Sequence, residues 1–171
     1  VAGWGRCYTT FTTSAGMYII GFARSILVLT SSTRSRIEKF NQKLQAKLET
    51  IRQNEVRYFE HRVEDADVVV VGFGTAGRVA QTAVKQARAR GLRVGLFRPI
   101  SLYPFPEKRL AEIAAKVRGF LVVEMNAGQM VEDVRLAVNG RVPVKFYGRM
   151  GGVVPLPDEV VEEIRRMPKD E

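Results

Sequence analysis

Between residues 34 and 56 the hydrophobic positions follow a helical period. They recur at spacings of three and four, with Lys and Glu between them: Ile37, Phe40, Leu44, Leu48 and Ile51. This spacing places the apolar side chains on one face and predicts a single amphipathic helix. Ser35 followed by Glu38 has the spacing of a capping box and predicts the helix start there. We interpret residues 34–56 as a connecting helix.

From residue 57 onward, short apolar runs alternate with helical patterns. Strands are predicted at residues 57–63, 67–72, 92–97, 120–123 and 142–147. Helices are predicted at residues 75–90, from Pro106 onward, at 130–138 and near Asp158. Strands joined through helices require parallel pairing with right-handed crossovers. Residues 57–171 are therefore predicted to form a three-layer α/β domain, with residues 57–63 as a candidate edge strand.

Residues 1–33 differ from both later regions. They contain no acidic residue and are rich in Gly, Thr, Ser and aliphatic residues. The stretch from Phe11 to Thr30 is about long enough to cross a bilayer, but polar and charged residues such as Arg24 interrupt it. We treat residues 1–33 as an atypical segment that cannot be assigned, with a membrane anchor as the minor alternative.

The composition narrows the possible chemistry. Cys7 is the single cysteine and His61 the single histidine, which excludes an intrachain disulfide, an iron–sulfur cluster held by cysteines and a His/Cys zinc site. No Ser/His/Asp or Cys/His set is available for nucleophilic catalysis. The net charge of +9 raises the question of nucleic acid or another acidic partner. No zinc finger, basic zipper or RNA-type aromatic motif accompanies it, so we expect no nucleic-acid binding, and an acidic electron carrier suits the charge equally well.

A glycine-rich turn follows the second predicted strand. Gly72, Gly74 and Gly77 form the pattern G-x-G-x-x-G, with Thr75 inside it, between a strand and a helix. Such glycines can bring a backbone close to a dinucleotide pyrophosphate. The acidic residue expected at the end of the next strand is absent, because Phe97 and Arg98 occupy that place. A tight strand–helix turn is therefore favoured, and nucleotide binding, with Arg98 meeting a 2′-phosphate, stays open as an alternative.

The loops that leave the carboxyl ends of parallel strands gather at one edge, where ligands and partners usually bind. The candidate residues on these loops are Arg98, Glu124, Asn126, Gln129 and Arg149. Arg98 and Glu124 end successive predicted strands, so we expect them to pair with each other or to contact a partner.

Several segments resemble a known family. Residues 94–106, VGLFRPISLYPFP, resemble the L-R-P-I-T-L-x-P-F-P stretch of the transketolase C-terminal-like domain. Residues 123–130, VEMNAGQM, followed by Asp133-Val134-Arg135, resemble the alpha subunits of 2-oxoacid:ferredoxin oxidoreductases, and so do residues 147–152, YGRMGG. The resemblance covers roughly residues 35–167 and identifies the C-terminal domain II region of such a subunit.

This resemblance implies a five-stranded, mostly parallel sheet whose first strand is an antiparallel edge strand. The implied enzymes are cytoplasmic and convert a 2-oxoacid and coenzyme A into acyl-coenzyme A and CO2 on thiamine diphosphate and Mg²⁺, with iron–sulfur clusters that reduce ferredoxin. This chain is expected to hold none of these cofactors, to catalyse nothing alone, and to serve as a structural domain. Its expected partners are the beta subunit, through Arg98, residues 124–129 and Arg149, and the gamma subunit. Residues 1–33 do not resemble the pyrimidine-binding domain expected upstream, so a fragment or an altered gene product is expected.

Overall fold

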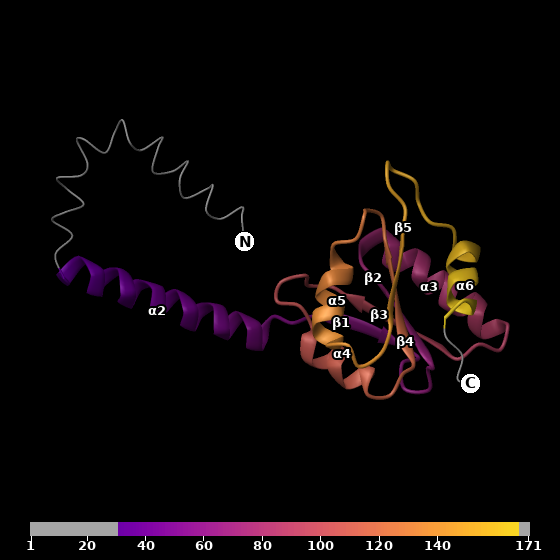
Figure 1. Ribbon diagram of the computed structural model, residues 1–171, viewed down its shortest axis with the longest axis horizontal. Coiled ribbons are helices and arrows are strands. Elements are labelled where there is room, and N and C mark those ends of the chain that lie inside the picture. Colours follow the sequence, from indigo (N-terminus) through magenta and orange to yellow (C-terminus); the bar gives the residue numbers. More distant parts are fainter. Residues whose placement is uncertain (1–30, 168–171) are drawn as a thin grey trace. The chain divides into compact units, whose positions relative to one another are not determined.

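The computed structural model describes residues 31–167 (Figure 1). The chain divides into two units at Thr50, and we describe the long helix and the α/β domain separately. The segment considered as a membrane anchor in the minor alternative, and Cys7, lie outside the described residues. No described helix is long and apolar enough to cross a membrane.

The helix α2 spans Ser31–Asn54. It includes all five of the predicted apolar positions, but it begins four residues earlier than predicted. Ser35 and Glu38 therefore lie inside the helix, and the prediction of a capping box at Ser35 is wrong. The division of the chain into segments 1–33, 34–56 and 57–171 stays a prediction.

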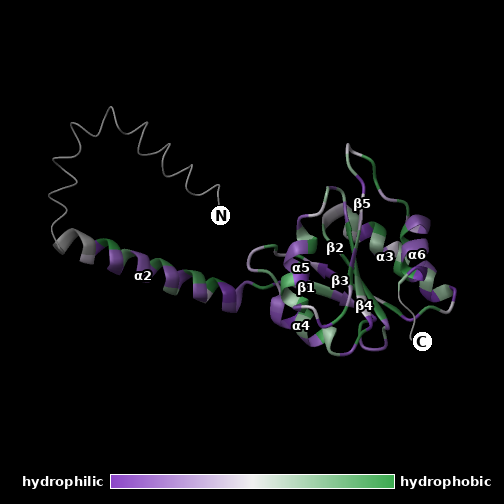
Figure 2. Ribbon diagram, in the orientation of Figure 1, coloured by the Kyte–Doolittle hydropathy of each residue, from purple (hydrophilic) through white to green (hydrophobic). Residues whose placement is uncertain are grey.

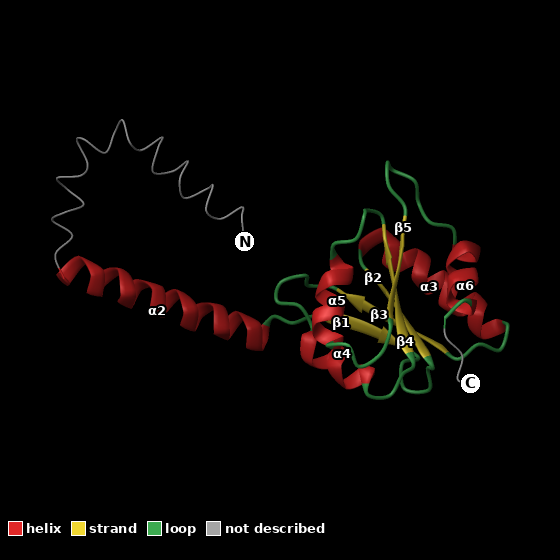
Figure 3. Ribbon diagram, in the orientation of Figure 1, coloured by secondary structure: helices red, strands yellow, loops and turns green. Residues whose placement is uncertain are grey.

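The domain is built on one five-stranded sheet with the order β1-β3-β2-β4-β5 (Figure 3). The strands are β1 Tyr58–His61, β2 Val68–Gly72, β3 Val94–Pro99, β4 Gly119–Glu124 and β5 Val144–Gly148. Strand β1 pairs antiparallel with β3, and all other pairs are parallel. The predicted fold class, including the antiparallel edge strand, is confirmed.

The helices cover both faces of this sheet. They are α3 Gly74–Ala89, α4 Glu107–Ala114, α5 Met130–Val138 and α6 Pro157–Arg165. The side chains of α3 and α6 pack with those of Val68 and Val70 on one face, and those of α4 and α5 pack with Val69 and Val71 on the other. The strands are consequently apolar on both sides, as Figure 2 shows by their green colour between mixed helices.

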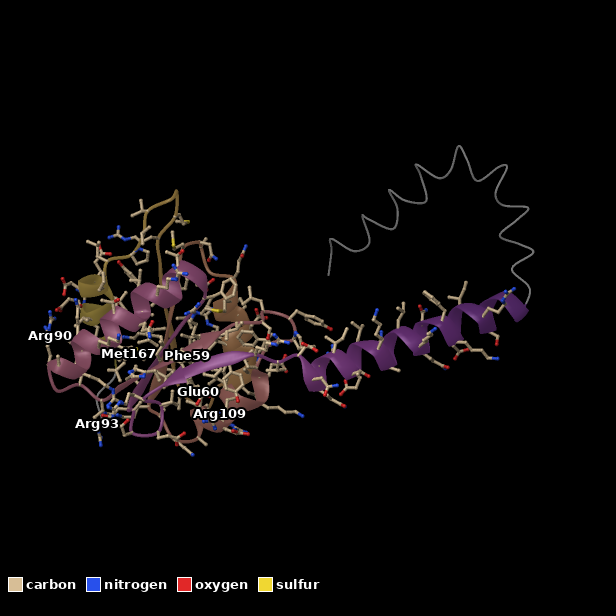
Figure 4. All side chains as sticks on the ribbon, turned by 180° about the vertical axis from the view of Figure 1, so that it is seen from behind. Phe59, Glu60, Arg90, Arg93, Arg109 and Met167 are labelled. Carbon is tan, nitrogen blue, oxygen red and sulfur yellow. The ribbon has the colours of Figure 1, made fainter. Side chains whose placement is uncertain are left out.

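Local sequence explains where these elements end. Gly91 after α3 and Asn139 after α5 both have positive φ, of 82° and 50°, a conformation that ends a helix. The helix α4 begins at Glu107, one residue later than predicted, with Pro106 as the residue before its first turn. The edge strand β1 is fixed to α4 by Arg109, whose Nε and Nη2 atoms donate to the Glu60 carboxylate at 2.7 and 2.9 Å (Figure 4).

Candidate subunit-contact edge

The carboxyl ends of β2, β3, β4 and β5 lie at one edge of the sheet, as parallel pairing requires. Four loops leave this edge: residues 73, 100–106, 125–129 and 149–156. Strand β1 starts at the same edge, because the Arg57 carbonyl accepts the N–H groups of Ile100 and Ser101 at 2.9 and 3.0 Å. We call these loops, together with residues 74 and 75 at the start of α3, the carboxyl edge.

The carboxyl edge is apolar and almost without charge. Arg149 is its one charged residue. Its exposed large hydrophobic side chains come from three loops: Phe73, Ile100, Leu102, Tyr103, Met150, Val153, Val154 and Leu156. The last of these loops stands at the top of the view in Figure 1, between β5 and α6. Few charges together with exposed aromatic residues and Met are typical of the buried centre of a protein–protein interface.

A hollow of about 540 Å³ opens on this edge between the β2–α3 and β4–α5 connections. Phe73, Leu102 and Met125 contribute apolar surface to it, and Thr75, Asn126 and Gln129 are among its polar residues. Its charged lining residues are the carboxylates Glu124 and Asp133, with no Lys or Arg. A phosphate-bearing ligand would therefore meet negative charge without a neutralising side chain.

Glu124 has a structural task at the base of this hollow. Its side chain is buried, with 5% of the residue exposed. The carboxylate accepts the backbone N–H groups of Gln129, Met130 and Val131 at 3.2, 3.0 and 2.9 Å. These are N–H groups at the start of α5, which have no acceptor within the helix, so Glu124 supplies the anion that a helix N-terminus favours.

The predicted pairing of Arg98 with Glu124 is wrong. The two residues end successive strands in the chain, but the sheet order places β2 between β3 and β4. Glu124 is directed to α5 instead. Arg98 lies opposite Phe59 of β1 in the antiparallel ladder, and its δ-carbon lies close to Gly77.

The other predicted contact residues have separate surroundings. Asn126 accepts the Gly128 N–H on its side-chain oxygen at 2.7 Å and so fixes the β4–α5 turn. The side chain of Gln129 is exposed beside it. The assignment of Arg98, Glu124, Asn126, Gln129 and Arg149 to a subunit contact stays a prediction.

The glycine-rich turn is explained by close packing. A Cβ on Gly77 would lie 2.7 Å from the Gly72 carbonyl oxygen, and a Cβ on Gly72 would lie 3.0 Å from the Gly77 Cα. Gly74 has a φ of 56°, which a side chain disfavours. At Gly77 the helix start thus approaches the strand end too closely for a side chain, and at Gly72 a Cβ would require its neighbours to shift. The pattern needs no ligand to account for it.

A cluster that the sequence analysis missed fixes the β5–α6 loop. The Tyr147 hydroxyl donates to Glu159 at 2.9 Å, and the Arg149 guanidinium donates both to that hydroxyl, at 3.3 Å, and to Glu159. Glu159 also accepts the Leu156 N–H at 3.0 Å, so one carboxylate binds groups at both ends of the loop. The Leu156 N–H, the Tyr147 hydroxyl and Arg149 together lower the pKa of Glu159. The pKa of the Tyr147 hydroxyl is raised, first by its burial and then by its hydrogen bond to the Glu159 carboxylate.

We expect the loop 149–156 to loosen in acid. Because the folded pKa of Glu159 lies below its ordinary value of 4.5, its contribution is complete above that value and is lost as the pH falls through the lowered pKa. Hydrogen exchange of residues 150–156 should accelerate below pH 4 relative to that of β2, after correction for intrinsic rates. In the Glu159→Gln variant, residues 150–156 should exchange faster than in the unchanged chain even at pH 7. Equal protection of the loop in both proteins at pH 7 would contradict this role.

The family described as "Pyruvate:ferredoxin oxidoreductase core domain II" matches residues 66–160, which contain strands β2 to β5 and helices α3 to α5. The chain belongs to this family. The resemblance of the sequence to 2-oxoacid:ferredoxin oxidoreductases is thereby confirmed.

The relatives of this chain are named as enzyme subunits. The chain is 47% identical over 134 residues to the ketoisovalerate oxidoreductase subunit VorB of Methanothermobacter thermautotrophicus, covering 78% of this chain and 38% of that protein. It is 39% identical over 104 residues to the 2-oxoglutarate synthase subunit KorA of Methanothermobacter marburgensis, covering 61% and 28%. The chain therefore spans less than two fifths of these relatives.

Two solved structures share the fold. The 2-oxoglutarate:ferredoxin oxidoreductase from Magnetococcus marinus matches with a TM-score of 0.65 and 20% identity, over 78% of this chain and 23% of that one. A split-gene transketolase matches with a TM-score of 0.57 and 21% identity, over 65% of this chain and 41% of that one.

Within residues 31–167, no group of three or more His, Cys, Asp or Glu side chains could hold a metal ion.

Proposed function

We propose that this chain is the C-terminal, architectural domain of the alpha-type subunit of a cytoplasmic, thiamine diphosphate-dependent 2-oxoacid:ferredoxin oxidoreductase. The whole complex converts a 2-oxoacid and coenzyme A into acyl-coenzyme A and CO2 and reduces ferredoxin. Thiamine diphosphate, Mg²⁺ and the iron–sulfur clusters are held by other parts of the complex. The beta subunit, and with it the gamma subunit, are the partners of this domain.

The observation that carries this proposal is the apolar carboxyl edge. A catalytic site needs convergent titratable groups, whereas these loops carry exposed Leu, Met, Tyr and Val, neutral polar residues such as Asn126 and Gln129, and the single charge of Arg149. The buried carboxylate of Glu124, at the end of β4 beside these loops, already accepts the N–H groups at the start of α5. The domain therefore offers a surface that excludes water and binds protein. We propose that the beta subunit covers it.

We expect substitutions on this surface to weaken the association. Leu102→Ser with Met150→Ser changes two exposed side chains on separate loops, 45% and 64% exposed. The double variant should raise the Kd for the beta subunit at least tenfold, about 1.4 kcal/mol, because two apolar contacts are lost. Isothermal titration calorimetry of the purified chain with the beta subunit of the same organism measures this.

Leu136→Ser is the matched control, since Leu136 is 77% exposed on α5 and lies outside the four loops. It should leave the Kd unchanged. If the Leu102/Met150 variant binds the beta subunit as tightly as the Leu136 variant, the carboxyl edge is not the contact surface.

A further inference from the structure

Among the partly buried arginines of residues 31–167, Arg98 differs from the others because it has no ion-pair partner. Four of them form an ion pair: Arg88 with Asp65, Arg109 with Glu60, Arg118 with Asp67 and Arg149 with Glu159. Arg98 forms neither an ion pair nor a hydrogen bond with any described residue, and its Nε atom is buried without an acceptor. A buried N–H donor without an acceptor lowers the stability of a folded protein. The terminal guanidinium nitrogens of Arg98 are not among the buried unpaired atoms.

The position of Arg98 is nevertheless set by packing. It is the second-last residue of β3, opposite Phe59 of β1. Its δ-carbon lies so close to Gly77 that a Cβ there would come within 3.2 Å of it. The apolar stem is therefore held between the sheet and the start of α3. Arg98 itself lies at the carboxyl end of β3, two residues before Ile100 of the carboxyl edge.

The surroundings of Arg98 determine which anion fits. Phe59, Phe73 and Ile100 are exposed large side chains on the segments next to it, and such surface is covered by protein more readily than by a small anion. The nearby hollow is lined by Glu124 and Asp133 without a Lys or Arg, which opposes a nucleotide phosphate. A planar guanidinium matches the two oxygens of a carboxylate.

We propose that Arg98 binds an aspartate or glutamate side chain of the beta subunit when that subunit covers the carboxyl edge. This inference rests on the proposed function and adds the charge pair that orients the contact. The unpaired guanidinium in the separate chain and the paired one in the complex are two states of the same site. Arg98 thus reduces the stability of the isolated domain and stabilises the assembly.

The test compares two variants. Arg98→Met keeps the apolar stem and removes the charge, and Arg98→Lys keeps the charge and removes the planar guanidinium with its paired N–H donors. In the isolated chain, Arg98→Met should raise the Tm by about 3 °C, because an unpaired buried donor is removed. The same variant should weaken binding to the beta subunit at least tenfold in calorimetry at 100 mM NaCl. Arg98→Lys should lie between Arg98→Met and the unchanged chain in affinity.

Opposite signs for stability and affinity separate this role from a structural one, which would lower both. If Arg98→Met lowers the Tm or leaves the affinity unchanged while the Leu102/Met150 variant still weakens binding, the proposed charge pair is wrong and the contact surface stands. If neither variant affects binding, the proposed function fails as well. A third experiment measures the Tm of the isolated chain with added phosphate or NADP. A rise in Tm that Arg98→Met abolishes would assign Arg98 to a phosphate ligand and overturn the inference.

Discussion

Replacing Glu124 by alanine is expected to lower the free energy of unfolding by about 4 kcal/mol. The side chain is 5% exposed and accepts three backbone N–H groups at the start of α5. Alanine leaves these donors without an acceptor in a place that water reaches poorly. The Val134 and Val138 side chains of α5 belong to the core, so displacement of the helix start disturbs packing beyond the substituted residue.

Two further variants show whether the effect belongs to the carboxylate. Glu124→Gln keeps one side-chain oxygen as an acceptor and should cost about 2 kcal/mol. Asp133→Ala removes an exposed acidic residue from the first turn of the same helix and should cost less than about 1 kcal/mol. Urea denaturation followed by circular dichroism measures all three. A loss for Glu124→Ala no larger than that for Asp133→Ala would show that the three hydrogen bonds do not hold α5 in place.

The sequence predicts the elements of this domain well because each one is locally encoded. The Val-rich run before Gly72 suits only a strand that is buried on both faces. The helix predicted at residues 130–138 has the observed bounds of α5, because Asn139 and Gly140 end the apolar period. The antiparallel direction of β1 was implied by the resemblance to a family, since hydrophobic period alone does not give the direction of a strand.

The edge was predicted less well, for a reason of topology. The pairing of Arg98 with Glu124 assumed that successive strands are neighbours, whereas the crossover through α4 carries the chain past β2. The cluster of Tyr147, Arg149 and Glu159 depends on how a loop folds back on itself, which no local pattern gives. The apolar character of the edge could have been found, because the absence of charge from these loops is visible in the sequence once the strands are placed.

The contact between Gly72 and Gly77 leads to the second large effect. Alanine favours an α-helix over glycine by about 1 kcal/mol, so propensity alone predicts that Gly77→Ala stabilises α3. The structure predicts the opposite. The new Cβ would lie 2.7 Å from the Gly72 carbonyl oxygen and 3.1 Å from its carbonyl carbon, and these backbone atoms belong to the central strand β2 and cannot rotate away. Helix or strand must shift, at a cost of about 3 kcal/mol that exceeds the gain from propensity.

Thr75→Ala is the control for Gly77→Ala, because Thr75 is exposed in the same helical turn and its replacement should change stability by less than about 0.5 kcal/mol. Chemical denaturation of the two variants, with and without 1 mM NADPH, distinguishes the two explanations of the glycine pattern. If close packing requires Gly77, Gly77→Ala is destabilised and the nucleotide stabilises neither variant nor the unchanged chain. A Gly77→Ala variant with undiminished stability, in a protein that NADPH stabilises only when Gly77 is present, would instead assign these glycines to a nucleotide. Steric contact at 2.7 Å favours the first result, because no ligand is needed to make that position intolerant of a side chain.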